Sequence, residues 1–198
     1  MTPLGLTREG LAKRASQDLK DGDYVNLGQG IPTLVGSYID PSFEIMLHGE
    51  NGILGIGPHA EGKRRDIDLI NAGKEPVTLL SGASYFSSDI SFTMLRGGHL
   101  DICILGAYQV SEKGDIANWQ APGRTFGGMG GAMDLVASAD NIIVAMMHVN
   151  RKGESKLLKK CKLPITGLRC VKKIFTELAV IDIVNEEFVL KELAPGVT

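Results

Sequence analysis

The chain has 198 residues, a length that suits one hydrophobic core, so we expect a single domain over residues 1–198. Apolar residues make up 43% of the chain and the mean hydropathy is +0.05, which supplies enough apolar side chains for that core. The formal net charge of -2 argues against partners such as nucleic acid or an anionic membrane.

The first residues and the cysteines indicate in which cellular compartment the protein is found. Residues 1–5 lack the basic and then apolar segments of a secretory signal, and no run of about 20 apolar residues could span a bilayer. Cys103, Cys161 and Cys170 are odd in number and show no CxxC spacing, which is typical of buried thiols in a reducing compartment. We therefore expect a cytoplasmic protein without a metal site.

The N-terminal half predicts two helices, three strands and two glycine-rich loops. Thr7 can cap a helix that Asp21 and Gly22 end, with an apolar face formed by Leu11, Ala12, Ala15 and Leu19. The next elements are a strand at 24–27, a loop at 28–32, a helix at 33–39, a strand at 44–47, a loop at 49–58 and a strand at 77–80. A strand, a glycine loop and then a helix is an order typical of phosphate or carboxylate sites.

The C-terminal half continues the alternation of strands and helices. The predicted elements are a helix at 88–95, a strand at 102–105, a helix at 133–137, a strand at 141–147, and a hairpin of strands 178–184 and 188–193. This order predicts an α/β fold, with an open, mostly parallel sheet flanked by helices and an antiparallel edge.

Three glycine-rich loops, at 28–32, 49–58 and 127–135, suggest one shared site, because such loops collect at the carboxyl ends of parallel strands. The second loop holds Glu50, which is either an ordinary residue on a solvated turn or a nucleophile. The third loop opens a helix, whose free N–H groups could stabilise an oxyanion. A carboxylate facing such amides can attack a thioester, which is the chemistry of CoA transfer.

The chain resembles a known family, the beta subunits of the class I CoA-transferases that act on 3-oxoacids. The residues that carry the resemblance run through nearly the whole chain in the family's order. They are the motifs at 25–34 (VNLGQGIPTL), 50–55 (ENGILG), 69–74 (LINAGK), 96–101 (RGGHLD), 117–119 (ANW) and 128–135 (GMGGAMDL).

The resemblance implies a role for each matching site residue. Glu50 is the catalytic glutamate, the Gly130 and Gly131 amides form the oxyanion hole, and the residues Gly28, Gln29, Gly30 and Asn51 contact the acyl group or CoA. The implied reaction is a ping-pong transfer of CoA from succinyl-CoA to acetoacetate or 3-oxoadipate, through a glutamyl-CoA thioester. It uses CoA as a substrate and needs no metal ion or other cofactor. The implied partner is an alpha subunit, in a heterotetramer of two alpha and two beta subunits.

Two positions depart from the family pattern, and other functions stay open. Gly49 replaces the usual serine before the glutamate, and Gln29 replaces a small or aliphatic residue, so we expect altered substrate choice. The alternatives are an acetate or butyrate:acetoacetate CoA-transferase subunit, and a non-catalytic ligand-binding domain on the same scaffold. A dinucleotide-binding turn at Gly28 and Gly30 is disfavoured because its third glycine is absent.

Several conspicuous residues have ordinary interpretations. His48 and His99 lack metal-ligand spacing and are expected to be structural or to support the site indirectly. Arg96 could pair with a carboxylate or a CoA phosphate, or could be an ordinary cation at a helix end. Trp119 is expected in the core or at an interface. The cluster Lys156, Lys159, Lys160 and Lys162 predicts a solvated face.

Overall fold

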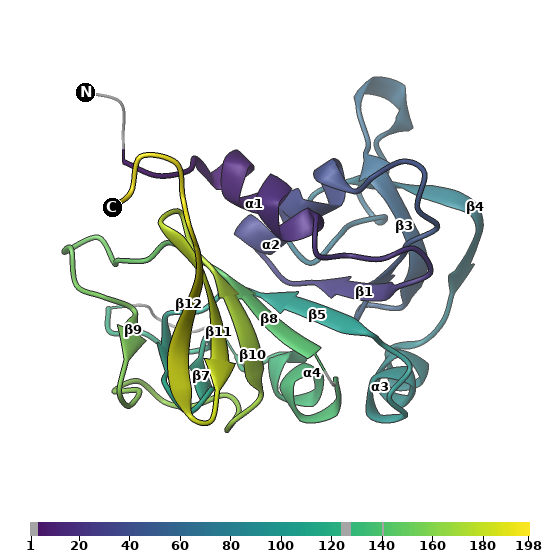
Figure 1. Cartoon of the computed structure of the whole chain (residues 1–198). Coiled ribbons are helices and arrows are strands. Elements are labelled where there is room, and N and C mark those ends of the chain that lie inside the picture. Colours follow the sequence, from purple (N-terminus) through teal and green to yellow (C-terminus); the bar gives the residue numbers. More distant parts are fainter. Residues whose placement is uncertain (1–3, 124–127, 140) are drawn as a thin grey trace.

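The computed structural model describes residues 4–123, 128–139 and 141–198, and within them a large sheet lies between two layers (Figure 1). The helices are α1 (Arg8–Ser16), α2 (Ile31–Val35), α3 (Ser88–Arg96) and α4 (Ala132–Ser138), with 3-10 turns η1 (Gly36–Tyr38) and η2 (Gly62–Arg64). The strands of the large sheet are β1 (Tyr24–Leu27), β2 (Met46–Gly49), β3 (Ile53–His59), β4 (Val77–Tyr85), β5 (Ile102–Leu105), β8 (Asn141–Ala145), β10 (Val171–Phe175), β11 (Ala179–Val184) and β12 (Glu187–Leu193). A small sheet contains β6 (Gln109–Ser111), β7 (Ile116–Ala117) and β9 (Leu157–Leu158).

The large sheet has the strand order β12-β11-β10-β8-β5-β1-β2-β3-β4. Its central strands, from β10 to β2, pair in parallel. The strands β3 and β11 run antiparallel to their central neighbours and continue into β4 and β12. The expected α/β fold with an open, mostly parallel sheet is confirmed, but antiparallel strands lie at both edges of the sheet rather than at one.

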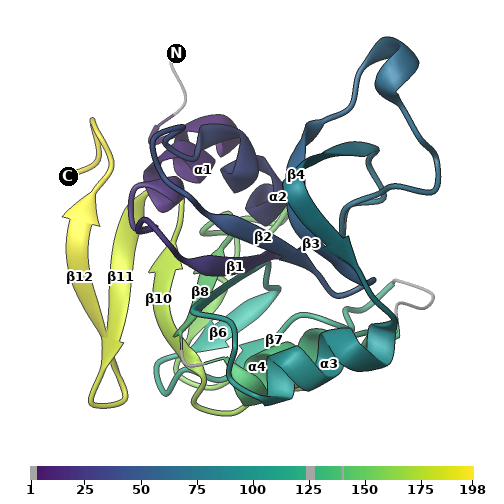
Figure 2. The ribbon, with the colours of Figure 1, turned by 90° about the vertical axis from the view of Figure 1, so that its right-hand side faces the viewer.

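The centre of the sheet is apolar because both of its faces are covered. In β5 all four residues are buried, and their side chains alternate between two clusters. Cys103 and Leu105 pack with α3 and α4, whereas Ile102 and Ile104 pack with α1 and α2. Figure 2 shows α1 and α2 on one face and α3, α4 and β6–β7 on the other.

Most predicted elements lie where the local signals put them. The strands β1 and β5 have the expected bounds, and α3, α4 and the β11–β12 hairpin differ by one residue at some of their ends. The first helix, however, ends at Ser16 rather than at residues 21–22, and Leu19 is buried beyond its end. The second helix begins at Ile31, two residues early, with Pro32 in its first turn.

Residues 53–58, expected in a glycine-rich loop, form the strand β3 instead. Hydrogen bonding to β2 on one side and β4 on the other holds this segment extended, and Ile53 and Ile56 are buried. Register shifts in the pairing of β3 with β4 accommodate the irregular sequence of this segment. Glu50 therefore lies in a tight turn of a hairpin and not in a long loop.

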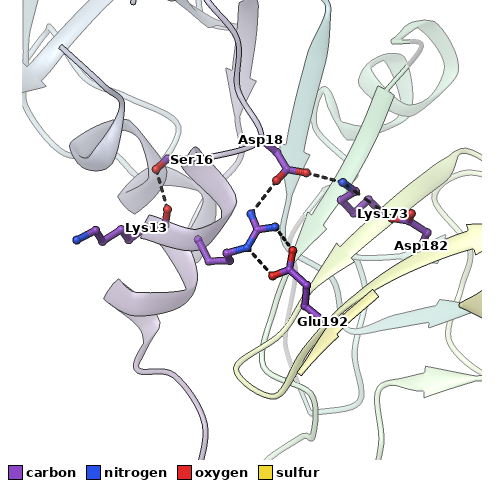
Figure 3. Close-up of polar contacts among 7 residues, drawn as sticks. Lys13, Ser16, Asp18, Lys173, Asp182 and Glu192 are labelled. Atoms are coloured by element: carbon purple, nitrogen blue, oxygen red, sulfur yellow. Dashed lines mark hydrogen bonds and ion pairs between the residues drawn. The ribbon is translucent and has the colours of Figure 1, made fainter. Parts of the chain in front are cut away.

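Helix α1 is tied to the C-terminal strands by a polar cluster (Figure 3). Arg14 Nε donates to Glu192 on β12 at 2.8 Å, and Arg14 Nη1 donates to Asp18 at 2.7 Å. Asp18 also accepts from Lys173 on β10. Burial alone would raise the pKa of Asp18, but the hydrogen bonds from Lys173 and Arg14 outweigh it and hold the pKa below its usual value. The cluster fixes α1 across the sheet edge.

Candidate active site

A cavity of about 630 Å³ opens beside the carboxyl ends of β1, β5 and β8. It brings together three segments that the sequence analysis singled out separately. Its lining includes six of the seven residues expected in the site, which are Gly28, Gln29, Gly30, Glu50, Gly130 and Gly131. The crevice outside the carboxyl ends of parallel strands is where open α/β sheets bind their ligands. Gly127, the first residue of the third glycine loop, lies outside the described residues.

Glu50 directly follows β2, and its carboxylate lies against Gly131. A methyl group on Gly131 would overlap Glu50 Oε2 and would lie 2.9 Å from Glu50 Cδ and 3.0 Å from Phe92 Cε1. Glycine at 131 is therefore what lets the main chain before α4 approach the carboxylate this closely. Burial, and then the charge of Asp134, raise the pKa of Glu50.

The carboxylate of Glu50 makes no ion pair or hydrogen bond with the residues that the structure describes. An ordinary surface glutamate would be exposed, and a structural buried glutamate would normally be paired. Glu50 is half-buried and faces a cavity. This combination does not fit the interpretation of Glu50 as a residue on a solvated turn.

A buried network holds the end of β2 just before Glu50. Asn26 Nδ2 donates to His48 Nδ1 at 3.2 Å and to the His48 carbonyl at 3.1 Å. Since an amide NH₂ can only donate, Nδ1 is the acceptor and the proton of the neutral ring is on Nε2. His48 Nε2 then donates to Ser91 Oγ at 2.9 Å, and the serine hydroxyl points to the Gly49 carbonyl at 3.4 Å. Burial lowers the pKa of His48 to about 4, so the ring is neutral at pH 7.

An ion pair joins α3 and α4, the two helices that lie near Glu50. Arg96 on α3 donates to Asp134 Oδ1 on α4 through Nε at 2.9 Å and Nη2 at 2.6 Å. The guanidinium also lies 5.8 Å from the centre of the Phe92 ring, which contacts the Gly131 position. Arg96 is the last residue of α3, so it is a cation at a helix end, and its partner is a carboxylate of the same chain. Ser91, in the network that holds the end of β2, lies on α3, and Gly131, which contacts the Glu50 carboxylate, directly precedes α4. The ion pair therefore links the two helices that support the position of Glu50.

The first glycine loop forms another wall of the cavity. Gly28 N donates to the Ile104 carbonyl at 2.9 Å, which ties the loop to β5. Gln29 and Gly30 are exposed on the cavity wall, just before α2 begins. The unusual amide at position 29 is thus part of the cavity wall.

Asn51 is the one expected residue that does not line the cavity. Its side-chain Nδ2 donates to the Ile70 carbonyl at 2.9 Å. Its Oδ1 would lie 2.5 Å from a Cβ at Gly49, so a serine at position 49 would require this side chain to move. The Gly49 departure and the position of Asn51 are therefore coupled.

Among the cavity residues that sequence reasoning did not assign to the site are Asn26, Trp119 and Lys156. Asn26 and Lys156 line the cavity wall, and so does Trp119, which was expected in the core or at an interface. Asn26 could have been identified from the sequence, because an amide between Val25 and Leu27 in a buried strand needs a specific partner. Lys156 could not, because it is one lysine in a cluster of several.

Some classes of site are absent from the described part of the chain. No three His, Cys, Asp or Glu side chains in it come together as metal ligands would. Its helices are all too short or too polar to cross a bilayer. All three cysteines are free, and burial raises the pKa of Cys103 to about 12 and that of Cys161 and Cys170 to about 11. This agrees with thiols that serve only in packing.

Comparison with known proteins identifies relatives along almost the whole chain. The family model for coenzyme A transferase matches residues 8–198. The chain is 55% identical over 191 residues to a probable succinyl-CoA:3-ketoacid coenzyme A transferase subunit of Bacillus subtilis, covering 96% of this chain and 88% of that protein. It is 47% identical over 193 residues to a 3-oxoadipate CoA-transferase subunit of Pseudomonas putida, covering 97% and 90%. A second Bacillus subtilis relative, 48% identical over 191 residues and covered to 88%, is named as a probable coenzyme A transferase beta subunit.

A solved structure has the same fold. The acyl-CoA transferase YdiF of Escherichia coli O157:H7 superimposes with a TM-score of 0.74 at 23% identity. The match covers 100% of this chain and 40% of that one, so this chain spans less than half of that larger protein.

Proposed function

Since the chain belongs to the coenzyme A transferase family, we propose that it is the catalytic beta subunit of an enzyme that moves CoA between carboxylic acids. The observation that carries this proposal is the half-buried Glu50 carboxylate, which lies against Gly131 in the cavity without a partner among the described residues. The donor that we propose is succinyl-CoA, and the acceptor is a 3-oxoacid, acetoacetate or 3-oxoadipate. The names of two relatives support this choice, since one is a 3-ketoacid and the other a 3-oxoadipate transferase subunit.

In the proposed mechanism Glu50 is the nucleophile. Its carboxylate attacks the thioester carbonyl of the acyl-CoA, the carbon–sulfur bond breaks, and CoA leaves as a thiolate. The product is a mixed anhydride of Glu50 and the donor acid. The thiolate attacks the glutamyl carbonyl, the donor acid leaves as a carboxylate, and a glutamyl-CoA thioester remains. An acceptor carboxylate reverses these steps and departs as the new acyl-CoA.

The surroundings of Glu50 suit these steps. We propose that the Gly130 and Gly131 amides donate to the oxyanion that forms at each attack. The contact of Gly131 with the carboxylate and the place of both glycines in the cavity lining support this. The desolvation that raises the pKa of Glu50 also makes the carboxylate a stronger nucleophile than it would be in water. Gly28, Gln29 and Gly30 would contact the acyl group, and Asn51 would reach it only after leaving Ile70. The cycle is balanced with CoA as substrate, without a metal ion or redox cofactor.

We further propose that the chain works with an alpha subunit, in a complex of two alpha and two beta subunits. The support is that the bacterial relatives are named as single subunits of their enzymes, one of them as a beta subunit. An acetate or butyrate:acetoacetate transferase would use the same steps with other acids, so the choice of acid is what the experiment must settle.

The test is the intact mass of this chain, purified with its partner subunit, after exposure to succinyl-CoA without an acceptor. We expect a CoA adduct that peptide mapping places on Glu50 and that disappears when a 3-oxoacid is added. The variant Glu50→Gln should give no adduct. If the folded wild-type complex forms none with succinyl-CoA, acetyl-CoA or butyryl-CoA, the proposed mechanism is wrong.

A further inference from the structure

Lys156 lines the same cavity as Glu50 but comes from the other side of it. Glu50 follows β2, whereas the main chain of Lys156 is bound to the segment after β8, with Lys156 N donating to the His148 carbonyl at 2.9 Å. The strands β1 and β5 lie between β2 and β8, so the two attachment points are roughly 14 Å apart at the usual strand spacing. Both residues line the cavity, and this separation leaves room between them for a short acyl group.

The main chain at Lys156 is well fixed. Besides its bond to His148, its carbonyl accepts from Val110 N at 2.9 Å, and β9 begins at the next residue. The side chain is half-buried, whereas Lys159 and Lys160 on the same segment are exposed. Lys156 is therefore set apart from the solvated lysines with which its sequence grouped it.

The Lys156 ammonium makes no ion pair or hydrogen bond with any residue in the described ranges. Glu177 is near enough for its charge to act on Lys156, but the pair exceeds ion-pair distance and Glu177 Oε2 accepts from His148 N at 2.6 Å. Burial lowers the pKa of Lys156 to about 8. A half-buried cation without a partner is costly, and an anion bound in the cavity would compensate that cost.

We propose that Lys156 binds the remote carboxylate of a dicarboxylic acyl group whose other end reacts with Glu50. This rests on the proposed function and adds a determinant of substrate choice to it. Glu50 and the amides near Gly131 serve the reacting carbonyl, and an acyl group with a methyl end offers Lys156 nothing to bind. An acyl group that ends in a carboxylate gives the ammonium a charge-assisted hydrogen bond. A phosphate of CoA is the other anion that could meet Lys156, and the experiment separates the two.

The experiment compares succinate with butyrate, which has the same four-carbon length but ends in a methyl group. Binding of each acid, and of free CoA, is measured by titration calorimetry on the chain assembled with its partner subunit. We expect the wild-type complex to bind succinate at least about 10-fold more tightly than butyrate. Lys156→Met should weaken succinate binding about 10- to 100-fold and leave butyrate and CoA unchanged. Lys156→Arg should retain most of the preference, and Lys160→Met is the matched control that should retain all of it.

An unchanged ratio of succinate to butyrate affinity in a folded Lys156→Met complex would overturn the proposal. So would a loss confined to CoA, because the anion would then be a phosphate. The measurement needs no catalysis, so it is independent of the adduct test. A Lys156-dependent succinate site in a complex that never forms a CoA adduct would reject the proposed function and leave only the carboxylate site at Lys156, without the reaction at Glu50.

Discussion

At the scale of single residues, the close approach of Gly131 to Glu50 is the feature on which the site depends most directly. Gly131→Ala would place a methyl group on Glu50 Oε2 and force the carboxylate away from the α4 end. We expect kcat to fall about 100-fold or more, since misplacing a nucleophile or an oxyanion donor has an effect of that order. Stability should change much less, which steady-state kinetics and a thermal melt together would check.

Gly128→Ala is the matched control for that prediction. Among the described residues, a Cβ at Gly128 meets only Gly130 N, at 4.0 Å, although Gly128 lines the same cavity. This variant should keep most of its activity. Equal losses in both variants would mean that any side chain in the glycine loop is harmful and that contact with Glu50 is not the cause.

Because His48 is buried, the stability of the protein should depend on pH. Its pKa is about 4 in the folded chain and about 6.5 when unfolded, so between these values the unfolded state binds more protons. The contribution of His48 is therefore complete above about pH 6.5 and decreases as the pH falls toward 4. We expect it to lower the free energy of unfolding by about 2–3 kcal/mol across that window.

Denaturant titrations at pH 7.5, 6 and 5 would measure this loss, with His48→Gln as the comparison. A glutamine amide can accept from Asn26 and donate to Ser91 but does not titrate. The difference in stability between the two proteins should therefore shift in favour of the variant as the pH falls. Parallel curves would show that His48 is not the titrating group.

At the scale of elements, α1 owes its position to contacts beyond its own sequence. Thr7 caps it, with its hydroxyl accepting from Gly10 N at 3.1 Å, but the helix has only nine residues, too few to be stable alone. Arg14 connects it to Glu192 and lies over the Phe175 ring at 5.4 Å. The polar cluster and the buried face of α1 together decide where the helix lies.

Arg14→Met should lower the free energy of unfolding by about 1–2 kcal/mol, because it removes several charge-assisted hydrogen bonds at a partly buried position. Lys13→Met, on the exposed face of the same helix, should change it by less than about 0.5 kcal/mol. Urea unfolding of both variants gives the comparison. If the two agree, the cluster contributes no more than an ordinary surface charge.

Contacts between elements also explain why some strands were predicted poorly from the sequence. The strands β1 and β5 have dense apolar signals of the right length, so their bounds were predicted correctly. In β10 two lysines interrupt the apolar residues, and Lys173 reaches Asp18 instead of packing inside. The strand β3 contains glycines and a proline, and its pairing with β2 and β4 overrides their local preference for a turn.

At the scale of the whole molecule, the layered fold controls the reactivity of the cysteines. Cys103 lies in β5, with parallel strands on both sides and packed side chains on both faces of the sheet. Its thiol should become accessible only when the sheet opens. Cys170, which is half-buried outside the central strands, should be labelled at lower denaturant concentration.

Iodoacetamide labelling at pH 8 along a urea series, read by peptide mass spectrometry, checks this order. Little labelling is expected in the native state, because burial raises the pKa of all three thiols. Rapid native labelling of Cys103 would contradict the placement of β5 at the centre of the sheet.

The sequence by itself determined the class of fold and predicted, through the family resemblance, the residues at the centre of the candidate site. Apolar runs of strand length, capping residues and glycine loops act over a few neighbours, so they can be identified before any tertiary contact is known. Glu50 between its glycines, the Gly28–Gly30 loop and the Gly130–Gly131 pair belong to this group.

Only the tertiary structure decided which of these groups meet and how. It placed Gly131 against Glu50, linked Asn26 to Ser91 through His48, and brought Lys156 out of a charged cluster into the cavity. It also directed the side chain of Asn51 to a hydrogen bond with the Ile70 carbonyl, outside the cavity lining. Such contacts join residues far apart in the chain. They depend on strand order and register in the sheet and on how the helices pack on its faces, which short-range patterns do not specify.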